Sequence, residues 1–583
     1  MTINQLSWRE LVPDGQPYLQ QPTQPVSPDT RIFSQLQARL CYGLTQLLHP
    51  RASTDIMLVK SPESPGYPAR IGAAVREMMP SELPLCGGRY QIDADTITLH
   101  PPQSSDDDFT AAGAVVTGDW FESEQLFGCV RWHGVMPQLQ PGLLHQANGG
   151  VLVLSLRSLL AQPLLWLRLK QMMTCGQFVW FSPDERRPFP VAIPPLPLRV
   201  KLILCGERDA LAEFQEMEPE IAGLAIYSEF EDNLQIIGPT SFALWRGWFH
   251  DLATQHRLPQ PQADAWVPLV REGVRYTGDQ LTLPLDPEWI LRQLREVAPF
   301  CQESFSGEQF LQMLEQREWR EGFLSERMQD EILLEQILIE TEGVRVGQVN
   351  ALSVIEFPGH PRAFGEPSRI TCVAHIGDGE FIDIERKAEL GGNIHAKGMM
   401  IMQAFLMAEL ELEQQIPFSA SLTFEQSYSE VDGDSASMAE LCALVSALSD
   451  VPLSQSIAIT GSVDQFGRSQ PVGGLNEKIE GFFRICQHRG LSGRQGVIIP
   501  DANVRHLALH QEVLDAVETG QFTLWAVNDA RDALTLLSGL PWDDEQRPGL
   551  LQIIQGRIAQ AQQQDPRHRY PWPLRWLNWF NHN

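Results

Sequence analysis

The chain has 583 residues, with 44 Lys or Arg against 73 Asp or Glu, so its formal net charge is −29. This length exceeds what one hydrophobic core supports and predicts three to four structural units. The negative charge repels phosphate backbones and argues against a nucleic-acid partner. No run of about 18 uninterrupted apolar residues occurs, so no membrane span is expected.

Nine cysteines lie scattered between Cys41 and Cys486 without a CxxC pair. The odd count and wide spacing favour reduced thiols over a disulfide framework or a zinc site. The N-terminus MTINQLSWRELVPDGQ lacks the basic and apolar segments of a signal peptide. These features predict a cytoplasmic protein.

The first half of the chain begins with a Pro- and Gln-rich segment, for which an N-terminal arm over residues 1–40 is predicted. Beyond it, apolar runs alternate with helical ones. Three of the runs predict buried strands of a parallel sheet: IMLVK (56–60), GVLVLSL (150–156) and VKLILCG (200–206). Residues 41–255 are therefore expected to form an α/β module.

The middle of the chain changes to helical periodicity. WILRQLREVAPF (289–300) and RMQDEILLEQILIETEG (327–343) are amphipathic, which predicts a small helical domain over 256–342. Strands and helices mix again from 343 to 540, and a Gln-rich tail follows over 541–583. The tail aromatics could share one helix face that either packs on the body or docks on a partner: Trp572, Trp576, Trp579 and Phe580.

The segment EVDGDSAS (430–437) allows two interpretations of Ser435. In the structural one, Asp434 is an N-cap and Gly433 forms the turn before a helix. The helix itself is predicted by apolar residues at helical spacing: Met438, Leu441, Cys442, Val445 and Leu448. In the catalytic interpretation, Ser435 is a nucleophile beside a helix N-terminus, where N–H groups and the helix dipole stabilise an oxyanion.

A serine nucleophile needs a base, and the segment VGGLNEKIEGFFRIC (472–486) offers Lys478. The buried face of this predicted helix comprises Leu475, Ile479, Phe482 and Cys486. Lys478 borders that face, and burial would lower its pKa toward the range of a general base. In the structural alternative, the lysine extends to water.

Together, the two segments resemble the proteolytic domain of the Lon protease family, over residues 343–540. FEQSYSEVDGDSAS fits the family's D-G-x-S-A pattern around Ser435, and VGGLNEK fits its G-G-L-x-E-K pattern, which ends on Lys478. The spacing between the two residues also fits. VIIPDANVRHL (497–507) resembles the strand and loop that follow the lysine helix in the family.

The resemblance implies a serine endopeptidase with a Ser–Lys dyad, in which Ser435 attacks the peptide carbonyl and Lys478 carries the proton. Asp434, with Ser437 after the serine, is similar to the B type of Lon. Thr460, in AITGS, matches a threonine that in the family helps to hold the lysine amine.

Three further acidic residues lie near the serine in the sequence: Glu425, Glu430 and Asp432. One interpretation is that they shape the site. The other, equally compatible with the sequence, is that they are solvated turn residues.

Residues 41–255 resemble the ATPase half of Lon-like proteins, but the nucleotide motifs are degenerate. In LHQANGGVLVLSLRSLL (144–160), Ser155 and Leu156 replace the acidic pair of Walker B. LVKSPESPGYPARI (58–71) keeps Gly66 but lacks the Lys–Ser/Thr pair of a P-loop. Three prolines there also remove backbone N–H donors: Pro62, Pro65 and Pro68. We expect that the chain requires no cofactor or metal, although the family uses ATP and magnesium.

The predicted fold is therefore an α/β multidomain protein: a degenerate AAA+-like parallel-sheet module, a small helical domain and a Lon-type α+β proteolytic domain. The resemblance implies unfolded or damaged protein substrates and a homo-oligomeric, hexameric ring. An alternative from another class is a non-proteolytic Lon-like adaptor or scaffold. The intact pair of Ser435 and Lys478 favours the enzyme over this alternative.

Overall fold

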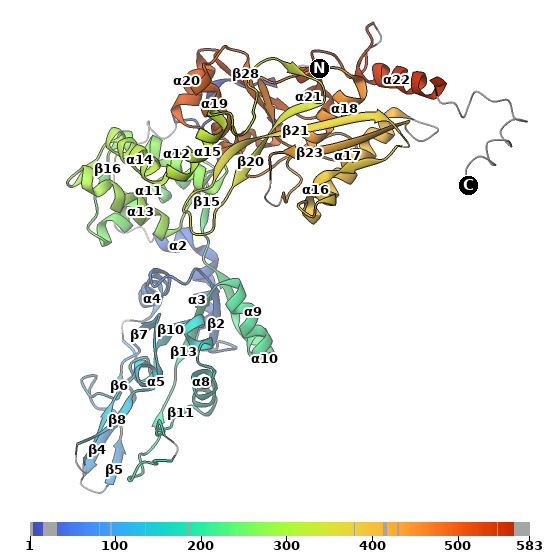
Figure 1. Ribbon diagram of the computed structural model, residues 1–583. Coiled ribbons are helices and arrows are strands. Elements are labelled where there is room, and N and C mark those ends of the chain that lie inside the picture. The colour runs from blue at the N-terminus through green and yellow to red at the C-terminus, as the bar shows by residue number, and fades with distance from the viewer. Residues whose placement is uncertain are drawn as a thin grey trace, which may run out of the picture.

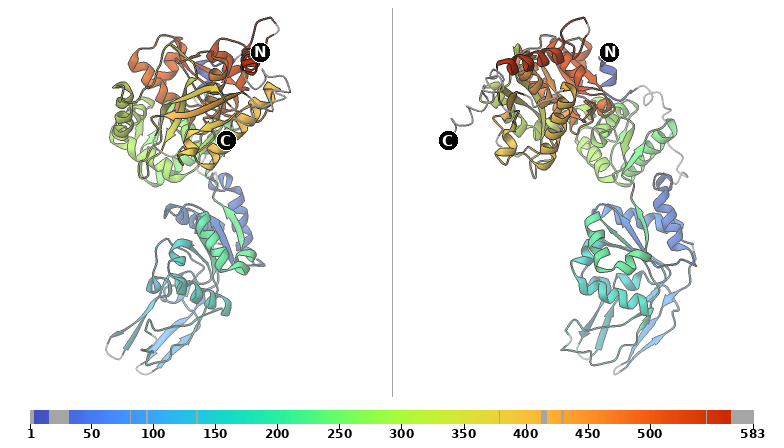
Figure 2. Two further views of the ribbon diagram at one scale, coloured as in Figure 1. Left: turned by 45° about the vertical axis from the view of Figure 1, so that its right-hand side comes forward. Right: turned by 90° about the vertical axis from the view of Figure 1, so that its right-hand side faces the viewer.

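The chain forms an elongated molecule with two lobes (Figure 1). The computed structural model describes residues 4–15, 32–80, 82–93, 96–133, 136–184, 186–377, 379–411, 417–427, 431–544 and 546–564. One lobe contains the ATPase-like module, and the other contains the helical and C-terminal regions. Figure 2 shows the same separation from two further sides. Among the described residues, no helix combines the length and apolar character needed to cross a bilayer.

A five-stranded parallel sheet forms the centre of the smaller lobe. Its order is β14 (Ile226–Glu229), β2 (Ile56–Lys60), β13 (Lys201–Gly206), β10 (Val151–Ser155) and β7 (Val115–Gly118). The three apolar runs predicted as parallel strands are β2, β10 and β13, so that prediction is confirmed.

Helices cover both faces of this sheet, which explains why its three central strands, β2, β13 and β10, are largely apolar. One face packs on α3 (Ala38–Leu48) and α4 (Gly66–Met78). The other packs on α7 (Leu156–Leu160), α8 (Pro163–Cys175) and α9 (Arg208–Met217). Two hairpins extend to the far end of the lobe (Figure 1): β4 (Arg89–Asp93) with β5 (Thr96–His100), and β8 (Cys129–His133) with β9 (Met136–Gln140).

The helical domain is larger than predicted. It contains α2 (Ile32–Leu36), α11 (Pro239–Gln255), α12 (Trp266–Thr277), α13 (Pro287–Val297), α14 (Gly307–Glu321) and α15 (Phe323–Leu333). The predicted boundary at 256 is wrong, because Trp245 and Phe249 of α11 share a core with Trp266 and Ile290. Periodicity alone does not show which core a helix joins.

The helix predicted over 327–343 is only half formed. It ends at Leu333, and Glu335 adopts a left-handed backbone with φ 59°. Ile339 is then buried against Ile332 and Ile485, so its apolar character serves a contact with the C-terminal region. The apolar residues after Leu333 therefore lie in the connection between two domains, although their spacing is that of a helix.

The C-terminal region is built on an eight-stranded mixed sheet. Its order is β1 (Asn4–Gln5), β29 (Phe522–Val527), β28 (Gln495–Pro500), β25 (Ile457–Ile459), β20 (Gln348–Ile355), β21 (Phe364–Ile376), β23 (Phe418–Glu425) and β22 (Phe381–Asp383). One face packs on α17 (Asn393–Leu410), α18 (Ser437–Ser449), α21 (Ala530–Ser538) and α22 (Leu550–Gln564). The other packs on α19 (Leu475–Arg489) and α20 (Gln511–Glu518).

Both ends of the chain differ from the prediction. Residues 4–12 do not form an arm, because β1 pairs antiparallel with β29, and Leu6, Leu11 and Val12 are buried in the C-terminal core. The tail does not begin at 541, because Trp542 and the buried face of α22 belong to the core around α18. In both places, the Pro- and Gln-rich composition concealed a few well-spaced apolar residues. The tail aromatics from Trp572 to Phe580 lie outside the described residues.

Candidate active site

Ser435 lies two residues before α18, in the chain segment between β23 and α18. Gly433 has φ 109°, a backbone conformation that favours glycine, and so forms the turn before the serine. The carbonyl of Ser435 accepts a hydrogen bond from the Gly461 amide at 2.9 Å, and the Met438 amide donates to the Gly461 carbonyl at 3.1 Å. The loop is thus fixed to the residues that follow β25.

Asp434 does not cap the helix as the structural interpretation proposed. The N-cap of α18 is Ala436, without a side-chain hydrogen bond. The Asp434 carboxylate instead accepts a hydrogen bond from the Ser462 hydroxyl at 3.0 Å. This contact directs the carboxylate across the loop rather than along the helix axis.

Lys478 lies in the first turn of α19, which packs on the opposite face of the sheet from α18. Its Nζ lies 3.1 Å from Ser435 Oγ and 3.3 Å from Thr460 Oγ1. A close approach of α19 to β21 places it there, since a Cβ on Gly481 would lie 2.1 Å from the carbonyl oxygen of Gly365. The structure therefore brings together three residues predicted from separate segments.

The surroundings of Lys478 are those of a candidate base. The residue is 3% exposed, so the alternative in which it extends to water is wrong. Burial lowers the pKa of Lys478 to about 8, against the opposing charges of Asp434 and Glu477. Near neutral pH, an accessible fraction of the amine is then unprotonated and can accept the proton of Ser435.

The other polar residues near the serine have structural partners. Glu425 accepts a hydrogen bond from the Thr371 hydroxyl at 2.7 Å, and the exposed Asp432 accepts one from the Gly433 amide at 3.0 Å. Ser437 is buried, and its Oγ accepts from the Val463 amide at 3.2 Å. Glu430 lies outside the described residues.

Sequence reasoning missed a buried group of titratable residues close to this loop. It contains Asp383, Glu385, His395 and Glu440, all at most 8% exposed. The group joins α16 (Ile384–Lys387), α17 and α18. Its members come from distant segments and share no motif, so only a strongly apolar helix with a single carboxylate, as in α18, could have indicated it.

The two segments in which degenerate nucleotide motifs were predicted follow the carboxyl ends of β2 and β10. Ser155 caps α7 by accepting from the Ser158 amide at 3.4 Å, and Leu156 is fully buried. Arg157 Nε lies 2.5 Å from Glu63 Oε2, so the remnants of the two motifs are joined by an ion pair.

Two carboxylates of the helical domain contact the segment after β2, where a P-loop would lie. Ser64 Oγ donates to Glu288 Oε1 at 2.7 Å, and Tyr67 Oη donates to Asp286 Oδ1 at 2.7 Å. A Cβ on Gly66, the first residue of α4, would lie 3.3 Å from the Glu288 carboxylate. An internal anion therefore lies at the helix N-terminus where a nucleotide-binding domain would hold phosphate. These residues do not fit a magnesium–ATP complex.

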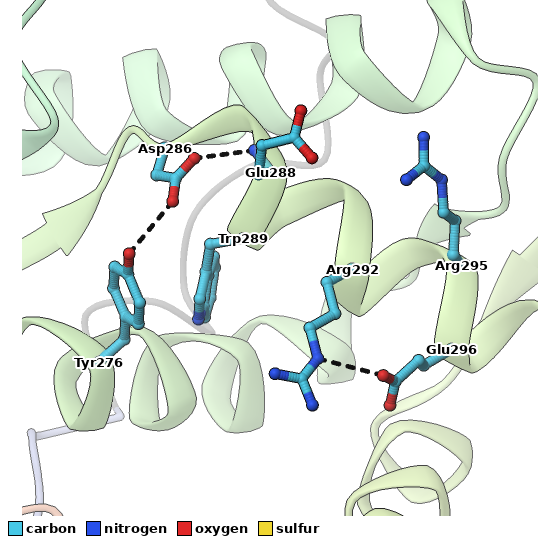
Figure 3. A pocket seen from close by; sticks show the side chains of 7 residues that line it. All are labelled: Tyr276, Asp286, Glu288, Trp289, Arg292, Arg295 and Glu296. Carbon is cyan, nitrogen blue, oxygen red and sulfur yellow. Dashed lines mark hydrogen bonds and ion pairs between the residues drawn. The ribbon is translucent and has the colours of Figure 1, made fainter. Parts of the chain in front are cut away.

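A cavity of about 490 Å³ lies in the helical domain, away from the serine. Figure 3 shows its lining, with Asp286 joined to Tyr276 and to the Glu288 amide, and Arg292 joined to Glu296; the other lining residues are Trp289 and Arg295. Most of its polar groups pair with one another. The contact of Ser435 with Lys478, rather than cavity size, therefore identifies the candidate active site.

Two family models match separate parts of this chain. A family model described as the LonB-like AAA domain matches residues 113–230, and one described as the Lon protease (S16) C-terminal proteolytic domain matches residues 428–535. The chain is 65% identical to a Lon protease homolog of Escherichia coli (strain K12) over 583 residues, all of both chains. It is 40% identical to a Lon protease homolog of Haemophilus influenzae over 570 residues, 95% of this chain and 93% of the relative. An archaeal Lon protease of Pyrococcus abyssi is 27% identical over 404 residues, 65% of this chain and 37% of the relative.

Proposed function

The chain belongs to the Lon protease family, and we propose that it is a serine endopeptidase in which Ser435 and Lys478 form the catalytic dyad. The observation that carries the proposal is the 3.1 Å contact between Lys478 Nζ and Ser435 Oγ, in surroundings that lower the pKa of the lysine. The proposed substrates are unfolded or damaged proteins.

The proposed reaction has two halves. In the first, Ser435 Oγ attacks the carbonyl carbon of the scissile peptide bond while Lys478 Nζ takes its proton. The C–N bond then breaks, the leaving amine takes the proton from Lys478, and an ester remains on Ser435. In the second half, Lys478 deprotonates a water molecule that attacks the ester, and the proton returns to Ser435. Backbone N–H groups of the loop before α18 are the proposed oxyanion donors. Thr460 orients the amine.

The proposal includes no ATP hydrolysis by this chain. It is supported by the pairing of Glu63 with Arg157 and of Ser64 with Glu288, which fills the remnants of the nucleotide motifs with protein groups. Without energy-driven unfolding, the substrates are limited to chains that are already loose.

The location and assembly are also proposals. Nine free cysteines support a cytoplasmic location. Three exposed apolar side chains on α17 support a homo-oligomer, which in the family is a hexameric ring: Ile394, Met400 and Met407.

The dyad is tested with purified protein and an unfolded casein substrate. Ser435→Ala, Lys478→Ala and the double variant are each expected to abolish cleavage to the same floor, because the members of one catalytic unit are not additive. Ser437→Ala is the matched control and should keep measurable turnover. Normal turnover by Ser435→Ala would refute the dyad, whereas absence of cleavage by the wild-type protein would support the non-proteolytic adaptor alternative.

The ATP proposal is tested with a tightly folded substrate and its denatured form. We expect cleavage of the denatured form only, at a rate that ATP and magnesium do not change. ATP-dependent degradation of the folded form, accompanied by phosphate release and absent with a non-hydrolysable analogue, would show that the module is a working ATPase.

A further inference from the structure

A histidine lies between two buried carboxylates beneath the Ser435 loop. His395 Nε2 is 3.2 Å from Asp383 Oδ2, and His395 Nδ1 is 3.6 Å from Glu440 Oε1. His395 and Glu440 are each 1% exposed, and within the described part of the chain neither oxygen of Glu440 has a hydrogen-bond partner. Among the described residues, no group of three or more His, Cys, Asp or Glu side chains is arranged to hold a metal ion.

The three residues come from the elements that surround the proposed nucleophile. Asp383 precedes α16 and caps it, His395 lies in the first turn of α17, and Glu440 lies in the first turn of α18. The Glu440 amide donates to the carbonyl of Ala436, the residue after the serine, at 2.9 Å. Glu440 is therefore one helical turn from Ala436, the residue that follows Ser435.

The start of α17 also contacts the loop directly. The Gly392 amide donates to the Val431 carbonyl at 2.9 Å, and the Val431 amide donates to the Leu390 carbonyl at 2.8 Å. A Cβ on Gly398 would lie 3.0 Å from the Asp434 Cβ, so α17 packs against the residue before the serine. A shift of α17 relative to α18 would therefore move the loop that contains Ser435.

We propose that Asp383, His395 and Glu440 are positioning residues, which lock α17 to α18 and thereby hold Ser435 at hydrogen-bond distance from Lys478. The imidazolium of His395 is the link, because among the described residues it is the cationic group that lies between the two carboxylates. Loss of its proton would leave two buried anions without a cation between them, and the lock would loosen.

The charges that face His395 support this role. Burial opposes the imidazolium, but the neighbouring Asp383 and the charges of Glu440 and Glu385 outweigh burial and raise the pKa of His395. Glu385 itself is tied to β23, where it accepts from the Thr423 hydroxyl at 2.7 Å and the Phe424 amide at 2.9 Å. Burial raises the pKa of Glu440 to about 7, so the cluster changes charge near neutral pH.

The positioning role is tested by hydrogen–deuterium exchange on the full chain, which does not depend on activity. Glu440→Gln keeps the shape of the side chain and removes its charge, whereas Glu409→Gln is the control. Glu409 lies at the other end of α17 and pairs with Arg531 and Trp542. We expect faster exchange of residues 431–438 in Glu440→Gln and His395→Gln, and wild-type exchange there in Glu409→Gln. Unchanged exchange in the cluster variants would overturn the inference.

The kinetic part rests on the proposed function and uses kcat against pH for casein cleavage. A displaced nucleophile lowers kcat, by up to about 100-fold for a shift near 1 Å, and leaves KM nearly unchanged. Glu440→Gln should also move the alkaline limit of kcat to lower pH, because His395 loses a neighbouring anion. A pH profile that coincides with wild type would overturn the inference. Absence of cleavage by wild type would refute the proposed function alone, and the exchange experiment would still decide the positioning role.

Discussion

Lys478 shows how the proposed chemistry conflicts with stability at a single residue. A lysine that is 3% exposed loses its hydration, and its pKa falls from 10.5 to about 8. At pH values between 8 and 10.5, the lysine binds a proton in the unfolded chain but not in the folded chain. The stability of the folded state therefore increases as pH rises through this range. Below pH 8, the folded state holds a buried cation and is correspondingly less stable.

Lys478→Met is therefore expected to stabilise the protein while abolishing cleavage. At pH 7 the gain should reach about 3 kcal/mol, because one pKa unit corresponds to about 1.4 kcal/mol. The hydroxyls of Ser435 and Thr460 lose their lysine partner in this variant, which reduces the gain in stability. The measurement is the thermal midpoint of both proteins from pH 7 to pH 10.5. The difference should change little below about pH 8 and shrink between pH 8 and 10.5, and a difference that stays constant over the whole range would mean that burial of the charge is not its cause.

At the scale of elements, the N-terminal strand completes a sheet that is otherwise formed by the far end of the chain. β1 pairs with β29, and the segment after it places Leu11 in the core without exposure. The Leu509 amide also donates to the Leu11 carbonyl at 3.0 Å. Residues 4–12 are thus part of the C-terminal region that contains the proteolytic domain.

Leu11→Ala should therefore destabilise the C-terminal region, although the residue lies more than 300 positions before it. Truncation of a buried leucine leaves a cavity and costs about 2–5 kcal/mol. Leu334→Ala is the control, since Leu334 is 70% exposed. The loss of stability is measured by chemical denaturation, with loss of casein cleavage as the readout of unfolding. Equal midpoints for the two variants would contradict the packing described for β1.

At the scale of the whole molecule, the two lobes are joined by two chain segments and by side-chain contacts. The segments are tied by Gln37, whose amide group donates to the Glu231 carbonyl at 2.7 Å and accepts from the Glu231 amide at 2.8 Å. Asp286 and Glu288 then connect the helical domain to Tyr67 and Ser64 of the module. These contacts restrict bending at the connection.

Removal of the side-chain contacts should allow the lobes to move. In the double variant Ser64→Ala/Tyr67→Phe, the carboxylates of Asp286 and Glu288 lose their partners in the module. We expect a larger spread of interlobe distances, measured by small-angle scattering, and faster proteolytic cleavage near residue 37. Arg208→Ala, which breaks an exposed pair with Glu229 within the module, is the control. A scattering profile equal to wild type would show that the backbone segments alone fix the lobes.

The sequence predicted what local pattern encodes and missed what depends on distant packing. The strands β2, β10 and β13 were predicted because strands covered on both faces are uniformly apolar. The group of Ser435, Lys478 and Thr460 was predicted because each residue lies in a short motif. The predicted domain boundaries were wrong where a helix such as α11 packs in a core whose other residues come from later in the chain. The cluster around His395 was not predicted, because its members become neighbours only after the sheet has formed.

The pairing of β1 with β29 has a consequence for synthesis of the chain. The partner of residues 4–5 is residues 525–526, so the first strand emerges from the ribosome long before its partner exists. At about 5 to 20 residues per second, this interval lasts from about 25 to about 100 seconds. Meanwhile the module and the helical domain can fold in order, whereas the proteolytic sheet lacks its edge strand. This edge strand is thus translated before the other strands of its sheet and is among the last to dock.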